Sequence, residues 1–366
     1  MSGLERGSLV EHATLGLGKV VAVEPDAVHV FFPGRGERHA AKLRLPGARA
    51  FLRTGIEERN AWLEGLSSFT LDAASGRWAL PARWLTLDQA VEQFVAGHPE
   101  GFDDGPSGRG GAWRAAHRLF QETLGNGEAE RLLDAGDLRD LLKRVLKIGR
   151  LVSPLHAEEE RDALEDALGD DDATRRFLRA LFELVSVPSP GRARFDKLFG
   201  VAAGLPAAPP ARWLLVTLLP FIARPDKHPL MHPGSTREAA ERLGFDLRWD
   251  ETPNWTTLCA LRAHSARLLE ALAPGGARDF IDVEVFAHAA STMRAGGAKR
   301  PKRAARAVAP TVASAKAAAR PAVKVAAKPA PAKAAKTPTA KPVAKPAAKA
   351  TAKKAARPAK KGAKRR

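Results

Sequence analysis

The chain has 366 residues, more than one hydrophobic core usually serves, so its length predicts two or three structural units. Its single cysteine, Cys259, excludes an internal disulfide and a thiolate metal cluster, and the favoured interpretation is a small buried apolar residue. The 59 Lys and Arg residues against 41 Asp and Glu residues give a net charge of +18.

The positive charge is concentrated at one end of the sequence. Residues 294–366 contain 23 Lys and Arg and no Asp or Glu, and Glu284 is the last acidic residue of the chain. The other 36 basic residues face all 41 acidic ones, so residues 1–293 carry a net charge of −5. The overall charge therefore belongs to the C-terminal segment.

The sequence shows neither the pattern of a secretory signal nor that of a membrane span. The start of the chain lacks a charged region followed by an apolar core. The most apolar stretch, residues 213–222, is about half as long as a bilayer requires and contains Pro220. We therefore expect a cytoplasmic protein without a membrane partner.

Residues 7–45 have the pattern of short strands separated by turns. Residues 19–23 (KVVAV) and 28–32 (VHVFF) are rich in β-branched and aromatic residues, with a turn at Pro25 and Asp26 between them. Residues 33–36 (PGRG) make a second break before a third segment at 37–45. This close spacing predicts a small curled barrel.

The same residues carry a resemblance to two known modules. Residues 7–12 (GSLVEH), 15–21 (LGLGKVV) and 28–34 (VHVFFPG) resemble the Tudor-like, SH3-like barrel at the C-terminus of UvrD-type repair helicases. They are also similar to the polymerase-interacting barrel of CarD-type transcription regulators. The resemblance covers roughly 45 residues and implies a binding module, with RNA polymerase, another protein or nucleic acid as partner, and no catalytic residues.

Two other interpretations of this module are disfavoured. The segment from Gly16 to Lys19 lacks the glycine spacing of a phosphate-binding loop and leads into a strand, so we expect its glycines to permit a tight turn. A methyl-lysine cage would have to be built from Phe31, Phe32 and Phe51, but adjacent strand residues face opposite sides.

From about residue 55 to 290 the periodicity changes to that of helices. Leu138, Leu141 and Val145 share one helical face, and Phe177 and Leu181 repeat the spacing later. Capping residues are expected at Thr86 with Gln89, at Ser235 with Glu238 and at Ser153, and C-terminal stops at Gly169 and Gly244. We predict a bundle of eight to ten helices.

This region resembles an uncharacterised bacterial helical domain. The matching residues are 85–90 (LTLDQA), 98–102 (HPEGF), 226–229 (DKHP), 241–245 (ERLGF), 253–255 (PNW) and 279–283 (DFIDV). The resemblance spans nearly the whole middle of the chain and implies one domain, without an assigned activity.

Several residues of the middle could carry chemistry. His228 and His232 have the four-residue spacing of helical metal ligands, but Pro229 and Pro233 break the helix that the spacing needs. The loop at residues 105–111 precedes a helix whose N-terminus could hold an anion, although it lacks a Lys-Ser/Thr signature. The seven tryptophans are dispersed, which favours core packing over a base-stacking surface. No cofactor is expected.

A group of carboxylates supplies the alternative to a binding function. Asp279, Asp282 and Glu284, with Lys227, have the residue types of a metal-dependent nuclease. Asp279 and Asp282 are equally explained as acids that interact with the dipole at a helix N-terminus, and we favour that interpretation.

The C-terminal segment consists mainly of Ala, Lys, Pro, Arg, Val and Thr. It lacks Leu, Ile, Phe and Trp and carries charge of one sign, so it cannot bury enough apolar surface to offset the entropy of ordering. The composition resembles the Lys/Ala/Pro tails of linker histones and of bacterial histone-like proteins, which implies sequence-independent nucleic-acid binding. The alternatives are an anionic membrane surface, which would normally need a further anchor, and the protein's own acidic patches at residues 158–160 (EEE) and 170–172 (DDD). The residues expected to contact the phosphate backbone are Lys299, Arg300, Lys302, Arg303, Lys324, Lys328, Lys333, Lys336, Lys341, Lys345, Lys349, Lys353, Lys354, Lys360, Lys361, Lys364, Arg365 and Arg366.

The sequence therefore predicts three structural parts and leaves two hypotheses about function. The parts are a small all-β SH3/Tudor-like barrel at 1–52, a mainly α-helical domain at 53–293 and a disordered basic tail at 294–366. The favoured function is a nucleic-acid-associated binding protein, with DNA preferred, linked to the nucleoid or to transcription. The alternative is a metal-dependent nucleic-acid-processing enzyme with its site in the helical domain.

Overall fold

The computed structural model describes residues 4–57, 59–102, 105, 107–156, 162–187 and 190–294. The chain divides into two units, Met1–Ala304 and Ala305–Arg366. The predicted tail lies outside the described residues from residue 295 onward, so the expectation of disorder there stays a prediction.

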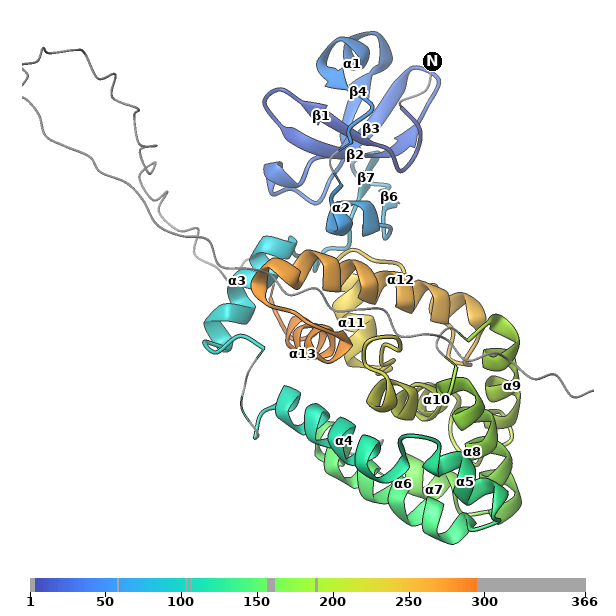
Figure 1. Ribbon diagram of the computed structural model, residues 1–366. Helices are drawn as coiled ribbons and strands as arrows, with labels where there is room; N and C mark the ends of the chain where they lie inside the picture. The colour runs from blue at the N-terminus through green and yellow to red at the C-terminus, as the bar shows by residue number, and fades with distance from the viewer. Residues whose placement is uncertain are drawn as a thin grey trace, which may run out of the picture. The chain divides into compact units, whose positions relative to one another are not determined.

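The N-terminal part is a curled antiparallel sheet of five strands, as the sequence predicted in outline (Figure 1). The strands are β1 (Leu9–His12), β2 (Gly16–Val23), β3 (Ala27–Phe31), β4 (Ala41–Arg44) and β5 (Leu52–Arg53), in the spatial order β4-β3-β2-β1-β5. A short helix, α1 (Leu45–Phe51), connects β4 to β5 and packs on β3 and β4. A register shift between Val20 and Ala22 in the β2–β3 pair adds local twist.

Adjacent residues of the strands pack on opposite faces of this sheet. Val20, Val30 and Phe32 belong to a small core inside the curl, together with Val10, Val28, Ala41, Ala48 and Leu52. Val21 and Phe31 point the other way and join the buried cluster that continues through the helices. The ring of Phe31 packs edge-on against Phe69 and Trp84 at centroid distances of 5.3 and 5.2 Å. The strand alternation thus serves two cores at once.

The two glycines of the β1–β2 connection have different roles. Gly16 has a φ of +73° and sits where the turn needs a left-handed residue, as expected. Gly18 lies within β2, where a Cβ atom would come within 2.6 Å of the Phe32 ring and 2.9 Å of Val30. Packing, and not the turn, therefore requires glycine at position 18.

A second, two-stranded sheet that the sequence reading missed follows the first. Strands β6 (Thr70–Asp72) and β7 (Arg77–Ala79) form an antiparallel hairpin. The backbone N–H of Ala40 donates to the carbonyl of Trp78 at 2.8 Å, and the His39 side chain bonds to Asp72 at 3.0 Å. The hairpin therefore fastens onto the segment before β4.

Helices make up most of the rest of the described chain, and twelve follow the strand β5. They are α2 (Ala61–Gly65), α3 (Leu87–Gly97), α4 (Arg109–Leu124), α5 (Glu128–Asp134), α6 (Leu138–Val152), α7 (Ala163–Ala167), α8 (Asp171–Val185), α9 (Arg192–Ala202), α10 (Pro209–Ala223), α11 (Ser235–Arg242), α12 (Trp255–Leu272) and α13 (Phe280–Ala290). The count exceeds the prediction of eight to ten because α2 and α7 are five-residue helices. None of the helices in this described part combines the length and the apolar content that a membrane span requires.

The helix ends agree with most of the predicted signals. Thr86 and Gln89 form a complete capping box at the start of α3. Gly244 follows α11 with a φ of +79°, as a C-terminal stop should. The prediction for Ser235 was wrong, because Gly234 is the N-cap of α11 and Ser235 is already its first helical residue. The prediction for Ser153 was also wrong, because Ser153 is the C-cap of α6.

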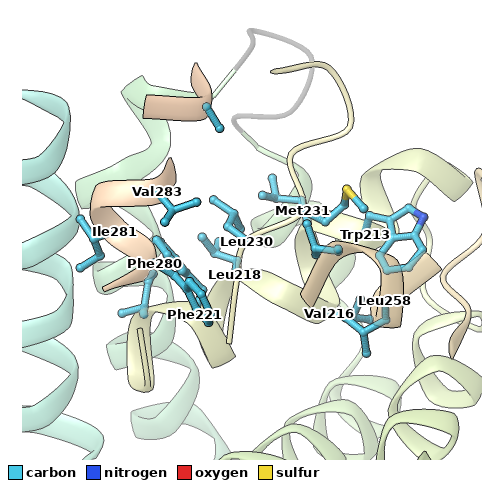
Figure 2. Close-up of a cluster of buried hydrophobic side chains, with 14 of the residues drawn as sticks. Trp213, Val216, Leu218, Phe221, Leu230, Met231, Leu258, Phe280, Ile281 and Val283 are labelled. Atoms are coloured by element: carbon cyan, nitrogen blue, oxygen red, sulfur yellow. The ribbon is translucent and has the colours of Figure 1, made fainter. Parts of the chain in front are cut away.

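Helix α10 supplies much of the core of the helical part. It is buried on every side from Trp213 to Ala223 and packs on α4, α8 and α9. Figure 2 draws side chains of this helix in a cluster of buried apolar residues that also includes Leu230, Met231 and Phe280. Thr217 adds a polar link, because its hydroxyl donates to the Trp213 carbonyl and accepts from the Met231 N–H. The apolar run is therefore a buried helix.

Candidate functional site

The predicted carboxylates lie together at the start of α13. Asp279 is the N-cap of this helix, and its carboxylate accepts hydrogen bonds from the backbone N–H groups of Ile281 and Asp282 at 3.0 and 3.3 Å. Asp282 is fully buried and Glu284 is 7 % exposed. The expected interaction with the helix N-terminus is thus confirmed for Asp279. Asp282 and Glu284 are buried, so each carboxylate needs hydrogen-bond or charged partners inside the protein.

Glu284 is held by a partly buried arginine and a buried tryptophan. Its carboxylate accepts from Nη2 of Arg109 at 2.6 Å and from Nε at 3.0 Å. The Trp113 indole N–H donates to the same carboxylate at 2.7 Å. Such a forked, charge-assisted arrangement satisfies the buried charge.

Asp279 and Asp282 share the guanidinium of Arg114. Nη1 of Arg114 lies 2.9 Å from Asp279 and Nη2 lies 2.6 Å from Asp282. Arg278 completes the set, with its backbone N–H and its Nε at 2.8 and 3.1 Å from Asp282. Burial lowers the pKa of Arg114, but the hydrogen bond and charge of Asp279, with those of Asp282, outweigh burial and raise the pKa above its ordinary value. We call Arg109, Arg114, Arg278, Asp279, Asp282 and Glu284 the α4–α13 ion-pair cluster.

This arrangement bears on the hypothesis of a metal-dependent nuclease. The three carboxylates are together, as such a site requires, but each is bound to arginine. The Lys227 ammonium is 3.7 Å from Asp226, which is its ion-pair partner. Side chains of His, Cys, Asp and Glu form no group of three or more suited to a metal ion among the residues that the structure describes. The cluster therefore has the geometry of a set of ion pairs that connects α4 to α13.

His228 and His232 do not converge on a common point. Both are buried, and burial lowers the pKa of each to about 4. The His228 ring lies edge-on to Phe195 at 6.2 Å, whereas the His232 ring stacks on His156 at 5.4 Å. The two rings therefore do not offer a pair of nitrogens that could bind one metal ion.

The loop that was considered for anion binding lies beside an ion pair. The loop at 105–111, of which Pro106 lies outside the described residues, leads into α4 through Gly108 as N-cap. Arg109 in its first turn already pairs with Glu284.

Core packing is confirmed for most tryptophans, since four of the seven are buried: Trp62, Trp84, Trp113 and Trp213. The cage is not formed by Phe31, Phe32 and Phe51, because the first two are buried on opposite faces and Phe51 is 67 % exposed.

Cys259 differs from its expected burial. It is half-buried on α12, where it lines a groove of about 600 Å³ between that helix, α2 and the segments around Arg6 and Arg248. Arg267 of α12 lines the same groove. Sequence reasoning missed these three arginines, because they are 242 and 19 residues apart in the chain and share no motif.

The predicted nucleic-acid-binding residues, from Lys299 to Arg366, all lie outside the described part of the chain. Comparisons of the chain with family models, curated proteins and solved structures give no match. The resemblances to the helicase and CarD-type barrels, to the bacterial helical domain and to linker-histone tails therefore stay predictions.

Proposed function

We propose that the protein is a nucleic-acid-associated binding protein, with DNA as the preferred partner, in which residues 294–366 provide sequence-independent affinity. One observation carries the proposal: 23 positive charges without a single acidic residue follow a body whose net charge is −5. Regularly spaced lysines suit contact with a phosphate backbone, and the prolines between them favour an extended chain.

The other parts have supporting roles in this proposal. The N-terminal barrel, of SH3/Tudor-like type, recruits a protein partner such as RNA polymerase, which links the protein to the nucleoid or to transcription. The helical domain is the scaffold between barrel and tail. The partner is sought by pull-down with a chain that ends at residue 294, because the tail would otherwise retain nucleic acid and whatever is bound to it.

The nuclease alternative is tested by incubating the protein with DNA and RNA in Mg²⁺ or Mn²⁺. The pairing of Asp282 with Arg114 and Arg278 disfavours this alternative. Cleavage that is lost in an Asp282→Ala variant, with the fold intact by circular dichroism, would favour the enzyme. Absence of cleavage with either metal supports the binding protein.

The proposal is tested by comparing DNA affinity in gel shifts of three chains. They are the full chain, a chain ending at residue 294, which keeps Met293 in the core, and a full-length chain in which the Lys and Arg residues of 295–366 are replaced by Gln. The proposal predicts that the second and third chains lose at least tenfold in affinity. Equal affinity in all three would contradict it.

A further inference from the structure

The groove on α12 is a cavity that the proposed function does not use. Its volume of about 600 Å³ falls within the range of ligand sites, and its wall combines charged, polar and aromatic side chains. Arg6 enters from the segment before β1, Arg248 from the segment after α11, and Arg267 from α12 itself. Trp255, Cys259 and His264 are among the other lining residues of α12.

The three arginines lack direct salt bridges in the described part of the chain, although the pKa of Glu64, lowered first by the hydrogen bond from Arg59, is lowered further by the charge of Arg267. Within the described residues, Arg6, Arg248 and Arg267 form no ion pair; the guanidinium of Arg6 lies over the Trp78 ring at 5.9 Å, and Nη1 of Arg267 donates to the backbone carbonyl of Glu64 at 3.4 Å. Such guanidinium groups keep most of their donors available to an anion.

The acids of the groove offset this charge only in part. The Glu64 carboxylate is bound by Arg59 at 3.1 Å, outside the groove lining, and Asp246 accepts from the backbone N–H of Arg248 at 2.8 Å. Lys19 lies behind the wall, where its ammonium donates to the carbonyls of Glu64 and Leu66 at 2.6 and 2.7 Å. Burial, followed by the charge of Arg267, lowers the pKa of Lys19 to about 8, so the Arg267 charge is felt at this wall.

A buried polar group without a partner lies on the same wall. His264 is 4 % exposed, and neither ring nitrogen has a hydrogen-bond partner among the described residues. Its ring packs against Phe245, another lining residue, at 4.3 Å. An unsatisfied buried nitrogen is costly, and this ring lies beside the groove wall.

We propose that this groove binds a phosphorylated ligand, with Arg6, Arg248 and Arg267 around the phosphoryl oxygens and Trp255 and Phe245 as an apolar wall beside them. Planar guanidinium groups suit the several oxygens of a phosphate better than a single carboxylate, which one arginine saturates. The tail of this chain is excluded as the occupant, because it carries the same sign of charge as the arginines. The phosphate can belong to a free nucleotide or to a nucleic-acid strand.

Cys259 makes the site directly measurable, because it is the only cysteine of the chain and it lines the groove. The full-length protein is alkylated with iodoacetamide, a neutral reagent, and the labelled fraction is followed by mass spectrometry. Pyrophosphate and ATP probe the free ligand, and a ten-nucleotide oligothymidylate probes the strand, all at one ionic strength set with NaCl. We expect at least one of these probes to slow the alkylation of Cys259 by tenfold or more at saturation.

The variants locate the effect. Arg267→Gln and Arg248→Gln are expected to raise the concentration needed for half-protection by at least tenfold. Arg175→Gln, on the exposed face of α8 and away from the groove, is the matched control and should leave protection unchanged. All these chains keep the same tail, so its affinity for nucleic acid cancels in the comparison, and failure of the groove would leave the proposed role of the tail untouched.

Protection by pyrophosphate or ATP identifies a free phosphorylated ligand, and protection by the oligonucleotide alone identifies a strand. The proposal is overturned if no probe slows alkylation, or if protection survives in both groove variants. It is equally overturned if a polyglutamate peptide protects Cys259 while the phosphorylated probes do not.

Discussion

Four histidines are buried as neutral side chains. Burial lowers the pKa of His156 and His264 to about 3 and that of His228 and His232 to about 4. Because the folded-state pKa lies below the unfolded value near 6.5, protons bind more readily to the unfolded chain. Their contribution to stability is therefore complete above pH 6.5 and is lost as the pH falls toward 3 to 4.

His264 allows this pH dependence to be tested at one residue, since burial is the sole cause of its shift. We expect the wild-type free energy of unfolding to fall from pH 7 to pH 5, with about 2 kcal/mol of the loss due to His264. In a His264→Phe variant, whose ring can pack on Phe245, the loss should be smaller by that amount. Urea denaturation at the two pH values measures it, and an unchanged loss in the variant would contradict the assignment.

Helices α4 and α13 are joined by buried charge as well as by apolar packing. The α4–α13 ion-pair cluster and the Trp113 indole place all three predicted carboxylates in contact with donors. Removing one partner of such a pair leaves a buried charge without compensation, which costs far more folding stability than the loss of an exposed pair. The cluster therefore fixes how the N-terminal ends of these helices meet.

We expect Glu284→Gln to lower the free energy of unfolding by about 3 kcal/mol, because Arg109 is left partly buried without its carboxylate. The matched control is Glu165→Gln, whose pair with Arg150 is exposed on both sides and should cost less than about 1 kcal/mol. Urea denaturation at pH 7 measures both. A double-mutant cycle tests the pair itself. The Arg109→Met, Glu284→Met double variant should lose less unfolding free energy than the Arg109→Met and Glu284→Met single variants lose together, and additive losses would argue against direct coupling.

At this scale the sequence predicted the elements with strong local patterns. The face of α6 with Leu138, Leu141 and Val145 is buried as the periodicity indicated, and the capping box of α3 is present. The β6–β7 hairpin escaped because its three-residue strands are too short for a period, and its anchoring bonds lead back to residues 39 and 40. The carboxylates of the cluster were predicted as a group, but their arginine partners were not, since Arg109 precedes Glu284 by 175 residues and no local signal pairs them.

For the whole molecule, the main result is the separation between a slightly acidic body and a segment of purely positive charge. The sequence alone establishes this separation, because it depends on composition and not on contacts. The groove could not be predicted, because its arginines come from three separate segments that only the fold brings together. Because residues 294–366 carry a charge of +23 and the body is slightly acidic, we propose that the tail is the main source of affinity for nucleic acid.

The salt dependence of DNA binding tests this claim most directly. If about ten of the 23 tail charges neutralise phosphates at once, the logarithm of the association constant should fall with a slope of about −9 against the logarithm of salt concentration. The chain ending at residue 294 should show a much shallower slope, with weak binding throughout. A full chain with a slope near zero, or a truncated chain with the same steep slope, would contradict the account.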